Sequence, residues 1–544
     1  GGIAGVLPLS GVVTPFLSYG STAMLVNFAC LGVLMAISAK PARPEPDPRF
    51  VRPVKVLAGV LAAFAVVIVA RAMWVQALKA DEIAGAGTLV YREDGSYALA
   101  YNPRLLSIAR RIPRGTIYDR NGLPLATSNW EELEKHRAAY AALGIDIDKA
   151  CSRADSRQYP LGAAAFHLLG DIRTRVRWAA PNAAFEEKIS RARLQGFNDG
   201  ERLETVVLPR SGERVRVVRY NYSELVPLLR ARMNPSDPAV RRLMEAPRDV
   251  RLSIDARLQA RLSRAFDEYL RRNRWRAGAV VVIRPTTGEL LASVSAPLPA
   301  GESRESLDLA RFGEYPPGSA FKLVTAMAAL RRDPGLLSKR YECVRLPDGR
   351  VGNRVRRRVI RDDLQDRHPH GSIDMRQALV HSCNAFFSQL GTYDVGAAGL
   401  RETAGLFNIA AARPDTDENV DADLPQAAYG QAQVLVTPWR LARVAGGIAA
   451  GGKLAPARVR LEPADGDPSM GRAVLDPALA AVLQAAMRTA VTSGTGRAAA
   501  AAPVAIAGKT GTAEVANAPS HAWFTGYAPA DAPVSQRIAF AILV

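Results

Sequence analysis

The sequence contains few cysteines, and its N-terminal segment contains no charged residues. Only four of the 544 residues are Cys, which is too few for a disulfide framework. Residues 1–39 contain no Asp, Glu, Lys, Arg or His, and the first charged side chain is Lys40. An initiator Met is also missing, since the chain starts at Gly1, and we therefore expect a fragment of a longer protein.

The overall composition excludes several classes of protein. Hydrophobic residues make up 48% and charged residues 23% of the chain, and the mean hydropathy is −0.03. Such a chain is neither disordered nor collagen-like, and it is not a polytopic membrane protein throughout its length. The net charge of +19 would suit nucleic acid, an anionic membrane or an anionic polymer.

Two apolar stretches predict membrane spans. Residues 21–38 are apolar or small over about the length of a bilayer crossing, and residues 56–78 form a second span if Arg71 reaches the surface. The Pro-rich linker between them, residues 40–55, holds five cations against two anions, which places it in the cytoplasm. A signal peptide ending near Ala72 is the alternative for the second stretch. In both cases we expect the rest of the chain to lie outside the cytoplasm. The positive charge is therefore not interpreted as a sign of nucleic-acid binding.

Residues 251–544 have the pattern of an α+β domain. An amphipathic helix over 254–270, with Asp255 as its candidate N-cap, precedes a predicted hairpin, whose strands are 279–284 and 290–294. Further strand patterns near the C-terminus predict an antiparallel sheet. Residues 79–250 are Arg-rich and show no long periodicity.

Three short motifs carry candidate catalytic residues. Ser319 and Lys322 follow Pro-Pro-Gly at the start of an apolar helix, where residues three apart share a face, as in serine acyl transferases. Ser382 and Asn384 lie on a short predicted loop. Lys509-Thr510-Gly511-Thr512 lies on a predicted strand, where Gly511 permits close approach of a ligand and the Lys and Thr groups suit a carboxylate. Each motif alone is weak.

In this order, S-x-x-K, S-x-N and K-T-G, the motifs resemble those of the penicillin-binding protein and serine β-lactamase superfamily. Residues 114–122, 157–162 and 167–170 are similar to the membrane-proximal elements of class B penicillin-binding proteins. The resemblance implies an α+β transpeptidase domain over 251–544, with an antiparallel sheet and helices and a truncated C-terminus. It also implies an extended pedestal or dimerisation domain over 79–250, a transmembrane anchor over 56–78 and two N-terminal transmembrane helices in all.

The first residues resemble a different family. Residues 5–11 and 15–20 are similar to the last extracellular loop of SEDS proteins, the FtsW and RodA type of peptidoglycan polymerase, and 21–38 would be their last helix. Residues 1–39 are therefore expected to be the C-terminal remnant of a SEDS protein fused to its transpeptidase partner. The earlier SEDS helices are not in the sequence, so we assign it no polymerase activity.

The resemblance implies a peptidoglycan D,D-transpeptidase of the cytoplasmic membrane, with its catalytic domain in the periplasm. Ser319 would form the acyl-enzyme, Lys322 would be its base, Ser382 would relay the proton and Asn384 would hold the substrate amide. Lys509, Thr510, Gly511 and Thr512 would bind the terminal carboxylate, and the backbone N–H groups of Ser319 and Thr512 would form the oxyanion hole.

The expected partners are stem peptides on nascent lipid-linked glycan strands, a SEDS polymerase, and β-lactams as inhibitors. No cofactor or metal is expected, because His368 and His370 are interpreted as loop residues. Cys343 and Cys383 are interpreted as free thiols, although a disulfide between them is the alternative. Two other functions stay open: a D,D-carboxypeptidase or β-lactamase-type hydrolase, and a scaffold that activates a SEDS glycosyltransferase. The sequence does not distinguish roles in elongation (cell shape), cell division and sporulation.

Overall fold

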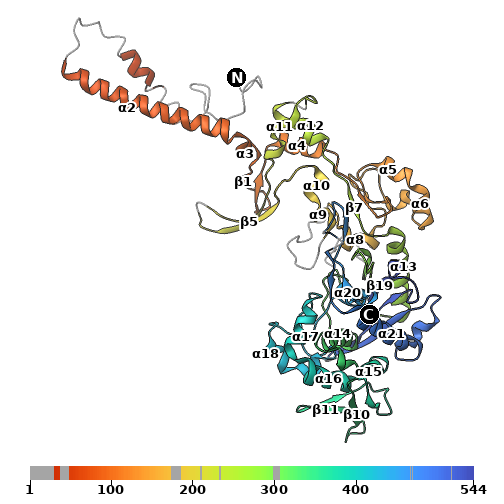
Figure 1. Cartoon of the computed structure of the whole chain (residues 1–544). Helices are drawn as coiled ribbons and strands as arrows, with labels where there is room; N and C mark the ends of the chain where they lie inside the picture. Colours follow the sequence, from red (N-terminus) through yellow and green to blue (C-terminus); the bar gives the residue numbers. More distant parts are fainter. Residues whose placement is uncertain are drawn as a thin grey trace. The chain divides into compact units, whose positions relative to one another are not determined.

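The computed structural model describes residues 28, 30–36, 48–172, 185–208, 211–231, 234–297, 307–465, 467, 470–515 and 518–544. The chain divides into two compact units (Figure 1). The first comprises Gly1–Ile112 with Phe197–Glu245, and the second Pro113–Gly196 with Ala246–Val544. This division differs from the expected boundary at residue 250, because 113–196 pack with the C-terminal part of the chain.

A long apolar helix begins the continuously described part of the first unit. Helix α2 spans Pro48–Met73, and its segment Val51–Met73 is long and apolar enough to cross a membrane, with a mean hydropathy of 2.4. It starts inside the expected linker, because Pro is compatible with the first turn of a helix. Residues 28 and 30–36 are also helical. The remaining residues of 1–47, with most of the expected first span, lie outside the described part.

The rest of the first unit consists of two hairpins and short helices around a small core. The antiparallel hairpins pair β1 with β2 and β5 with β6. The core contains Leu105, Tyr222, Leu225 and Leu228. The elements are η1 (Trp74–Leu78), α3 (Ala80–Gly85), β1 (Thr88–Tyr91), β2 (Tyr97–Ala100), α4 (Pro103–Arg111), β5 (Arg202–Val207), β6 (Arg214–Arg219), η2 (Ser223–Leu225), α11 (Val226–Arg230) and α12 (Pro238–Met244).

A five-stranded antiparallel sheet organises the second unit, with strand order β17-β18-β19-β8-β9. The predicted hairpin and the late strands are thereby confirmed. The strands are β8 (Gly278–Ile283), β9 (Leu290–Ala296), β17 (Ala507–Val515), β18 (Ala518–Ala528) and β19 (Ile538–Leu543).

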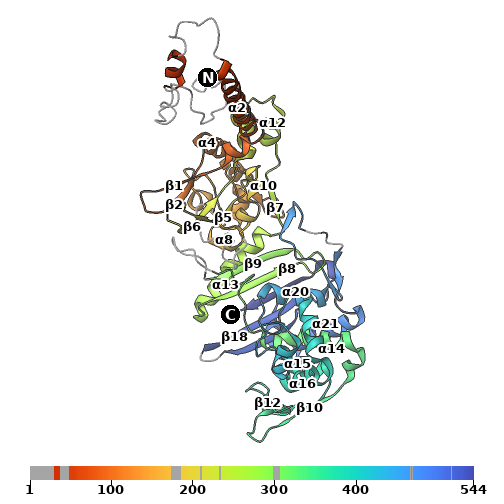
Figure 2. The same ribbon diagram turned by 90° about the vertical axis from the view of Figure 1, so that its left-hand side faces the viewer.

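The sheet is covered on both faces, which explains why β8 is apolar at every position. Side chains alternate between the faces of a strand. Val280 and Val282 pack with Phe266 of α13 (Ala256–Asn273), whereas Val281 and Ile283 belong to the main core that includes α20 (Pro438–Ala449). Figure 2 shows α13 and α20 beside these strands. Asp255 caps α13, as expected, by accepting from the backbone N–H groups at 257 and 258.

The remaining elements of the second unit surround this sheet. Two further four-stranded sheets have the orders β15-β7-β3-β4 and β12-β11-β10-β13. Their strands are β3 (Ile117–Tyr118), β4 (Pro124–Ala126), β7 (Val250–Leu252), β15 (Arg460–Glu462), β10 (Tyr341–Arg345), β11 (Val351–Val355), β12 (Arg358–Arg361) and β13 (Gly371–Ile373), and β14 (Lys453–Leu454) pairs with β16 (Arg472–Ala473). The helices of the segment 113–196 are α5 (Trp130–Lys135), α6 (Arg137–Ala142), α7 (Ile147–Ala150), α8 (Ala163–Leu169), α9 (Glu186–Ile189) and α10 (Arg191–Gln195). Those after β9 include η3 (Gly318–Phe321), α14 (Lys322–Arg332), η4 (Pro334–Ser338), α15 (Met375–His381), α16 (Asn384–Leu390), η5 (Gly391–Val395), α17 (Gly396–Gly405), α18 (Asp417–Ala422), α19 (Leu424–Ala427), α21 (Pro477–Thr492), η7 (Arg497–Ala501) and η8 (Val534–Gln536).

Candidate active site

Ser319 lies in a tight turn that leads into a buried helix. The turn, η3, is a 3-10 helix rather than the first turn of an α-helix, and α14 begins at Lys322. Gly318 starts the turn with φ +52, and a Cβ there would lie 2.2 Å from the carbonyl oxygen of Thr512. Only glycine fits this position, so the turn can lie against β17. Ser319 itself is half-buried, which leaves its hydroxyl open to a ligand.

Lys322 is completely buried, with an exposed fraction of 0%. Its Nζ donates to Ser319 Oγ at 3.0 Å, Ser382 Oγ at 3.3 Å and Asn384 Oδ1 at 2.6 Å, and it also contacts the Ser382 carbonyl oxygen. Burial lowers the pKa of Lys322 to about 8, although the Asp362 carboxylate acts in the opposite direction. The amine is therefore suited to take a proton from Ser319 near neutral pH.

The S-x-N motif forms the junction between α15 and α16. Ser382 ends α15 in the left-handed region, with φ 61, and Asn384 is the first residue of α16. The Asn384 side chain donates to the Arg361 carbonyl oxygen at 2.8 Å, which turns its Oδ1 toward Lys322. Asp362 accepts from the backbone N–H of Asn384, and this aspartate carries no signal in the sequence that could have singled it out.

Lys509 completes the chain of polar groups from the other side. It lies on β17, is 1% exposed, and donates to Ser382 Oγ at 2.8 Å and to the Thr510 carbonyl oxygen at 2.9 Å. Burial, together with the Lys322 charge, holds its pKa well below the usual value. Ser382 Oγ thus bridges two buried lysines, and a continuous hydrogen-bonded path joins Ser319, Lys322, Ser382 and Lys509.

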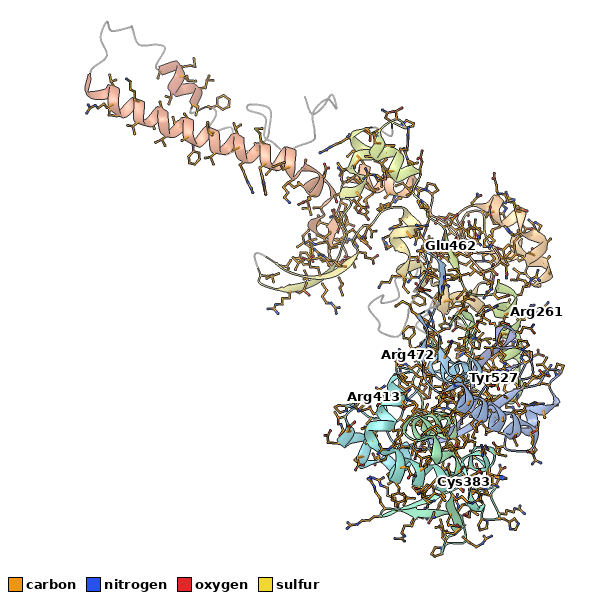
Figure 3. The ribbon with its side chains drawn as sticks, viewed as in Figure 1. Arg261, Cys383, Arg413, Glu462, Arg472 and Tyr527 are labelled. Carbon is orange, nitrogen blue, oxygen red and sulfur yellow. The ribbon has the colours of Figure 1, made fainter. Side chains whose placement is uncertain are left out.

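The other residues of the K-T-G segment line the edge of the sheet. Thr510 Oγ1 lies 2.9 Å from Thr495 Oγ1, a neighbour that the motif search missed. A Cβ at Gly511 would come within 2.6 Å of the Pro317 carbonyl oxygen, so glycine is needed for β17 to lie against η3. Thr512 is exposed beside this contact. The structure therefore brings every predicted site residue to one place, in the region of Cys383, which Figure 3 labels.

Four possible metal ligands lie directly behind the S-x-N motif. They are Cys343, Asp362, His370 and Cys383, whose donor atoms all lie within 4.8 Å of one another. Both cysteines are free thiols in the structure.

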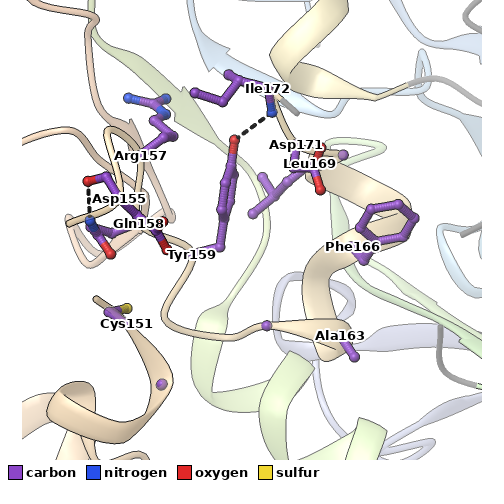
Figure 4. A pocket seen from close by; sticks show the side chains of 13 residues that line it. Cys151, Asp155, Arg157, Gln158, Tyr159, Ala163, Phe166, Leu169, Asp171 and Ile172 are labelled. Carbon is purple, nitrogen blue, oxygen red and sulfur yellow. Dashed lines mark hydrogen bonds between the residues drawn. The ribbon is translucent and has the colours of Figure 1, made fainter. Parts of the chain in front are cut away.

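A separate pocket lies near α7 and α8, away from these motifs (Figure 4). Its lining includes Arg157 and Tyr159 from the second class B-like segment. Tyr159 Oη accepts from the backbone N–H of Ile172 at 3.1 Å and donates to Glu187 Oε1 at 3.2 Å. Glu187 also pairs with Arg114 and Arg157 at 2.7 Å each. Glu187 therefore joins the first two class B-like segments, 114–122 and 157–162, in an ion-pair network.

Residues 278–544 match the family of the penicillin binding protein transpeptidase domain. The chain is 30% identical over 313 residues to the peptidoglycan D,D-transpeptidase PbpA of Mycolicibacterium smegmatis, and 32% identical over 314 residues to PbpA of Mycobacterium tuberculosis. Each alignment covers 49% of this chain and 61% of the relative.

Solved structures agree with this match. Penicillin-binding protein A of M. tuberculosis, in a ceftriaxone acyl-enzyme complex, has a TM-score of 0.56 and 24% identity over 80% of this chain and 93% of that one. Pseudomonas aeruginosa PBP2 has a TM-score of 0.51 and 24% identity, covering 79% and 91%. The second unit has the penicillin-binding transpeptidase fold. The resemblance of residues 1–39 to SEDS proteins stays a prediction.

Proposed function

We propose that the chain is a serine D,D-transpeptidase that cross-links peptidoglycan stem peptides and binds penicillin. The observation that carries the proposal is the hydrogen-bonded path from the Ser319 hydroxyl through Lys322 and Ser382 to Lys509, in which both amines are buried. The relatives named above as peptidoglycan D,D-transpeptidases, and the transpeptidase family match, support this choice of reaction.

In the proposed first step, Ser319 Oγ attacks the carbonyl carbon of a D-Ala-D-Ala bond while its proton passes to neutral Lys322. Ser382 then relays a proton to the leaving amine, so that D-Ala departs and the acyl group stays on Ser319. In the second step an amine of a neighbouring strand attacks the acyl-enzyme and gives up its proton along the same path. Ser319 is thereby regenerated with one new amide bond.

The substrate groups have matching partners in the site. Asn384 is placed to hold the donor amide, while Lys509, Thr510 and Thr512 offer a cation and two hydroxyls to the terminal carboxylate. Gly511 lets β17 lie against η3, which keeps Lys509 and Thr510 close to Ser319. The backbone N–H groups of Ser319 and Thr512 are proposed as the oxyanion hole, which the tight Gly318–Thr512 contact supports.

Labelling with a fluorescent penicillin tests the proposal. We expect covalent labelling of the chain, loss of labelling in Ser319→Ala, and full labelling in Ser338→Ala, which alters an exposed serine outside the site. A transpeptidase releases the bound penicillin slowly. Rapid release would instead indicate the β-lactamase alternative, and equal labelling of Ser319→Ala would refute the nucleophile.

We further propose that α2 anchors the chain in the cytoplasmic membrane, with 79–250 as a pedestal and the catalytic unit on the periplasmic side. The apolar segment Val51–Met73 and the cation-rich residues 40–55 before and within its start support this orientation. A cysteine at exposed Glu93 should react with a membrane-impermeant maleimide in intact spheroplasts, whereas one at Arg43 should not. The reverse pattern would contradict the orientation.

The charge-free segment supports one more proposal, that 1–39 are the end of a SEDS polymerase and that this polymerase supplies the lipid-linked strands. It predicts that the parent gene product, followed by an antibody to the catalytic unit, migrates as a single fused polypeptide. A separate transpeptidase band alone would refute the fusion.

A further inference from the structure

The four possible metal ligands come from four separate segments of the second unit. Cys343 lies in β10, Asp362 directly follows β12, His370 directly precedes β13, and Cys383 lies between α15 and α16. Figure 3 labels Cys383 within this part of the chain. Cys343, Asp362 and Cys383 are buried, and His370 is half-buried. Such a convergence of two thiols, an imidazole and a carboxylate needs an explanation.

Four of the six distances among the donor atoms are close to those of a tetrahedral ion site, and all six are within 4.8 Å. Asp362 Oδ2 lies 3.2 Å from each Sγ and 3.3 Å from His370 Nδ1, and Cys343 Sγ lies 3.4 Å from the same nitrogen. Bonds of about 2.0–2.3 Å to tetrahedral zinc place ligand atoms about 3.3–3.8 Å apart. Small shifts of the four side chains would therefore let one ion bind all of them.

We propose that Cys343, Asp362, His370 and Cys383 bind one Zn²⁺ ion. Two thiolates and an imidazole favour zinc over magnesium or calcium, which prefer oxygen ligands at higher coordination number. On binding, each thiol loses its proton to solvent, His370 Nδ1 coordinates as the neutral imidazole, and Asp362 contributes one carboxylate oxygen. With four protein ligands the ion has no open position, so its role is structural.

The second carboxylate oxygen of Asp362 connects this site to the S-x-N motif. Asp362 Oδ1 accepts from the backbone N–H groups of Asn384 and Ala385, the latter at 3.0 Å, at the start of α16. Cys383 lies between Ser382 and Asn384, and the side chains of both these neighbours contact Lys322 Nζ. The ion would therefore fix both residues relative to Lys322, which makes its ligands positioning residues.

The neighbouring groups fit an outer shell around the ligands. His370 Nε2 lies 3.9 Å from Asp366 Oδ1, a carboxylate able to orient the ring, and the His370 ring stacks on His381 at 5.2 Å between centroids. A disulfide between Cys343 and Cys383 is the competing chemistry. It would join the two thiols without using the Asp362 carboxylate or the His370 imidazole, which lie at the same point.

Metal analysis of the full chain, purified without a histidine tag, tests the site. We expect about one zinc per chain, falling below about a tenth in Cys343→Ser and His370→Ala, because loss of one ligand removes most of the affinity of such a site. His368→Ala is the matched control, since it alters an exposed histidine two residues away, and it should keep its zinc. Ser319→Ala should also keep its zinc, which separates this result from the test of the proposed nucleophile.

Cobalt provides a second measurement on the unaltered chain, in case the variants fold poorly. After removal of zinc with a chelator, one equivalent of Co²⁺ should produce thiolate-to-cobalt charge-transfer absorption and tetrahedral d–d bands, and zinc should displace them. Zinc below about a tenth per chain together with no cobalt–thiolate absorption would overturn the proposal. So would a disulfide-linked peptide containing Cys343 and Cys383, or His370→Ala with unchanged zinc.

Discussion

The buried amine of Lys322 predicts how acylation depends on pH. Only the neutral amine can accept the Ser319 proton, so the rate follows the neutral fraction. With a pKa of about 8 for Lys322, that fraction is about a tenth at pH 7 and about nine-tenths at pH 9. At the ordinary value of 10.5 it would be about one in 3,000 at pH 7, so burial increases the active form about 300-fold.

Acylation should therefore rise about 10-fold between pH 7 and pH 9 and then level off. The sign follows from the cause, because desolvation favours the uncharged amine and protonation at low pH removes the base. Lys322→Arg is the matched variant, since a guanidinium stays protonated throughout this range and should abolish the rise along with the activity.

The assay is the second-order rate of acylation by a fluorescent penicillin between pH 6 and pH 10, with Ser319→Ala as the blank for hydrolysis and non-specific labelling. A rate that does not change between pH 6 and pH 9 would refute the reasoning. So would a profile whose midpoint lies above pH 10, because Lys322 would then behave as a solvated amine.

Three further changes test the geometry. Ser382→Ala removes the hydroxyl that bridges both lysines and should lower the acylation rate about 10²–10³-fold with little change in melting temperature; an unchanged rate would exclude the relay. Gly318→Ala places a methyl group 2.2 Å from the Thr512 carbonyl oxygen at a φ of +52, so β17 must move and acylation should be lost; wild-type labelling would show that this contact is unimportant. Arg157→Ala breaks a buried pair with Glu187 and should lower the free energy of unfolding by about 3 kcal/mol in denaturant titration, while penicillin labelling of the folded fraction persists.

Local features were the ones that the sequence predicted well. The hairpin of β8 and β9, the Asp255 cap of α13 and the late strands depend on residues that are close in the chain. The pairing of Ser319 with Lys322 is equally local, because a single turn brings residues three apart together. The turn is a 3-10 helix rather than an α-helix, a difference that the pattern of apolar residues does not reveal.

The division into units depended on long-range packing and was not predicted. Residues 113–196 belong with the C-terminal part, and strand β3 pairs in parallel with β7, more than a hundred residues later. The Arg114, Arg157 and Glu187 network holds this segment together through buried charges from three places in the chain. A local pattern of apolar residues does not predict these ion pairs or this strand pairing, because each charged partner alone is indistinguishable from an ordinary surface residue.

By itself, the sequence determined the candidate nucleophile and its base, the apolar span and the individual strands, because each of these depends on residues that are close together in the chain. It also determined the order of the three motifs, because each motif is short enough to be recognised separately. Only the tertiary structure decided that Ser382 joins two buried lysines, and that Asp362 supports Asn384 on one side and faces two thiols and His370 on the other. Motif residues can be recognised separately, but the pKa of Lys322 and the clustering of the four possible ligands arise from burial and contact, which appear only when distant segments pack.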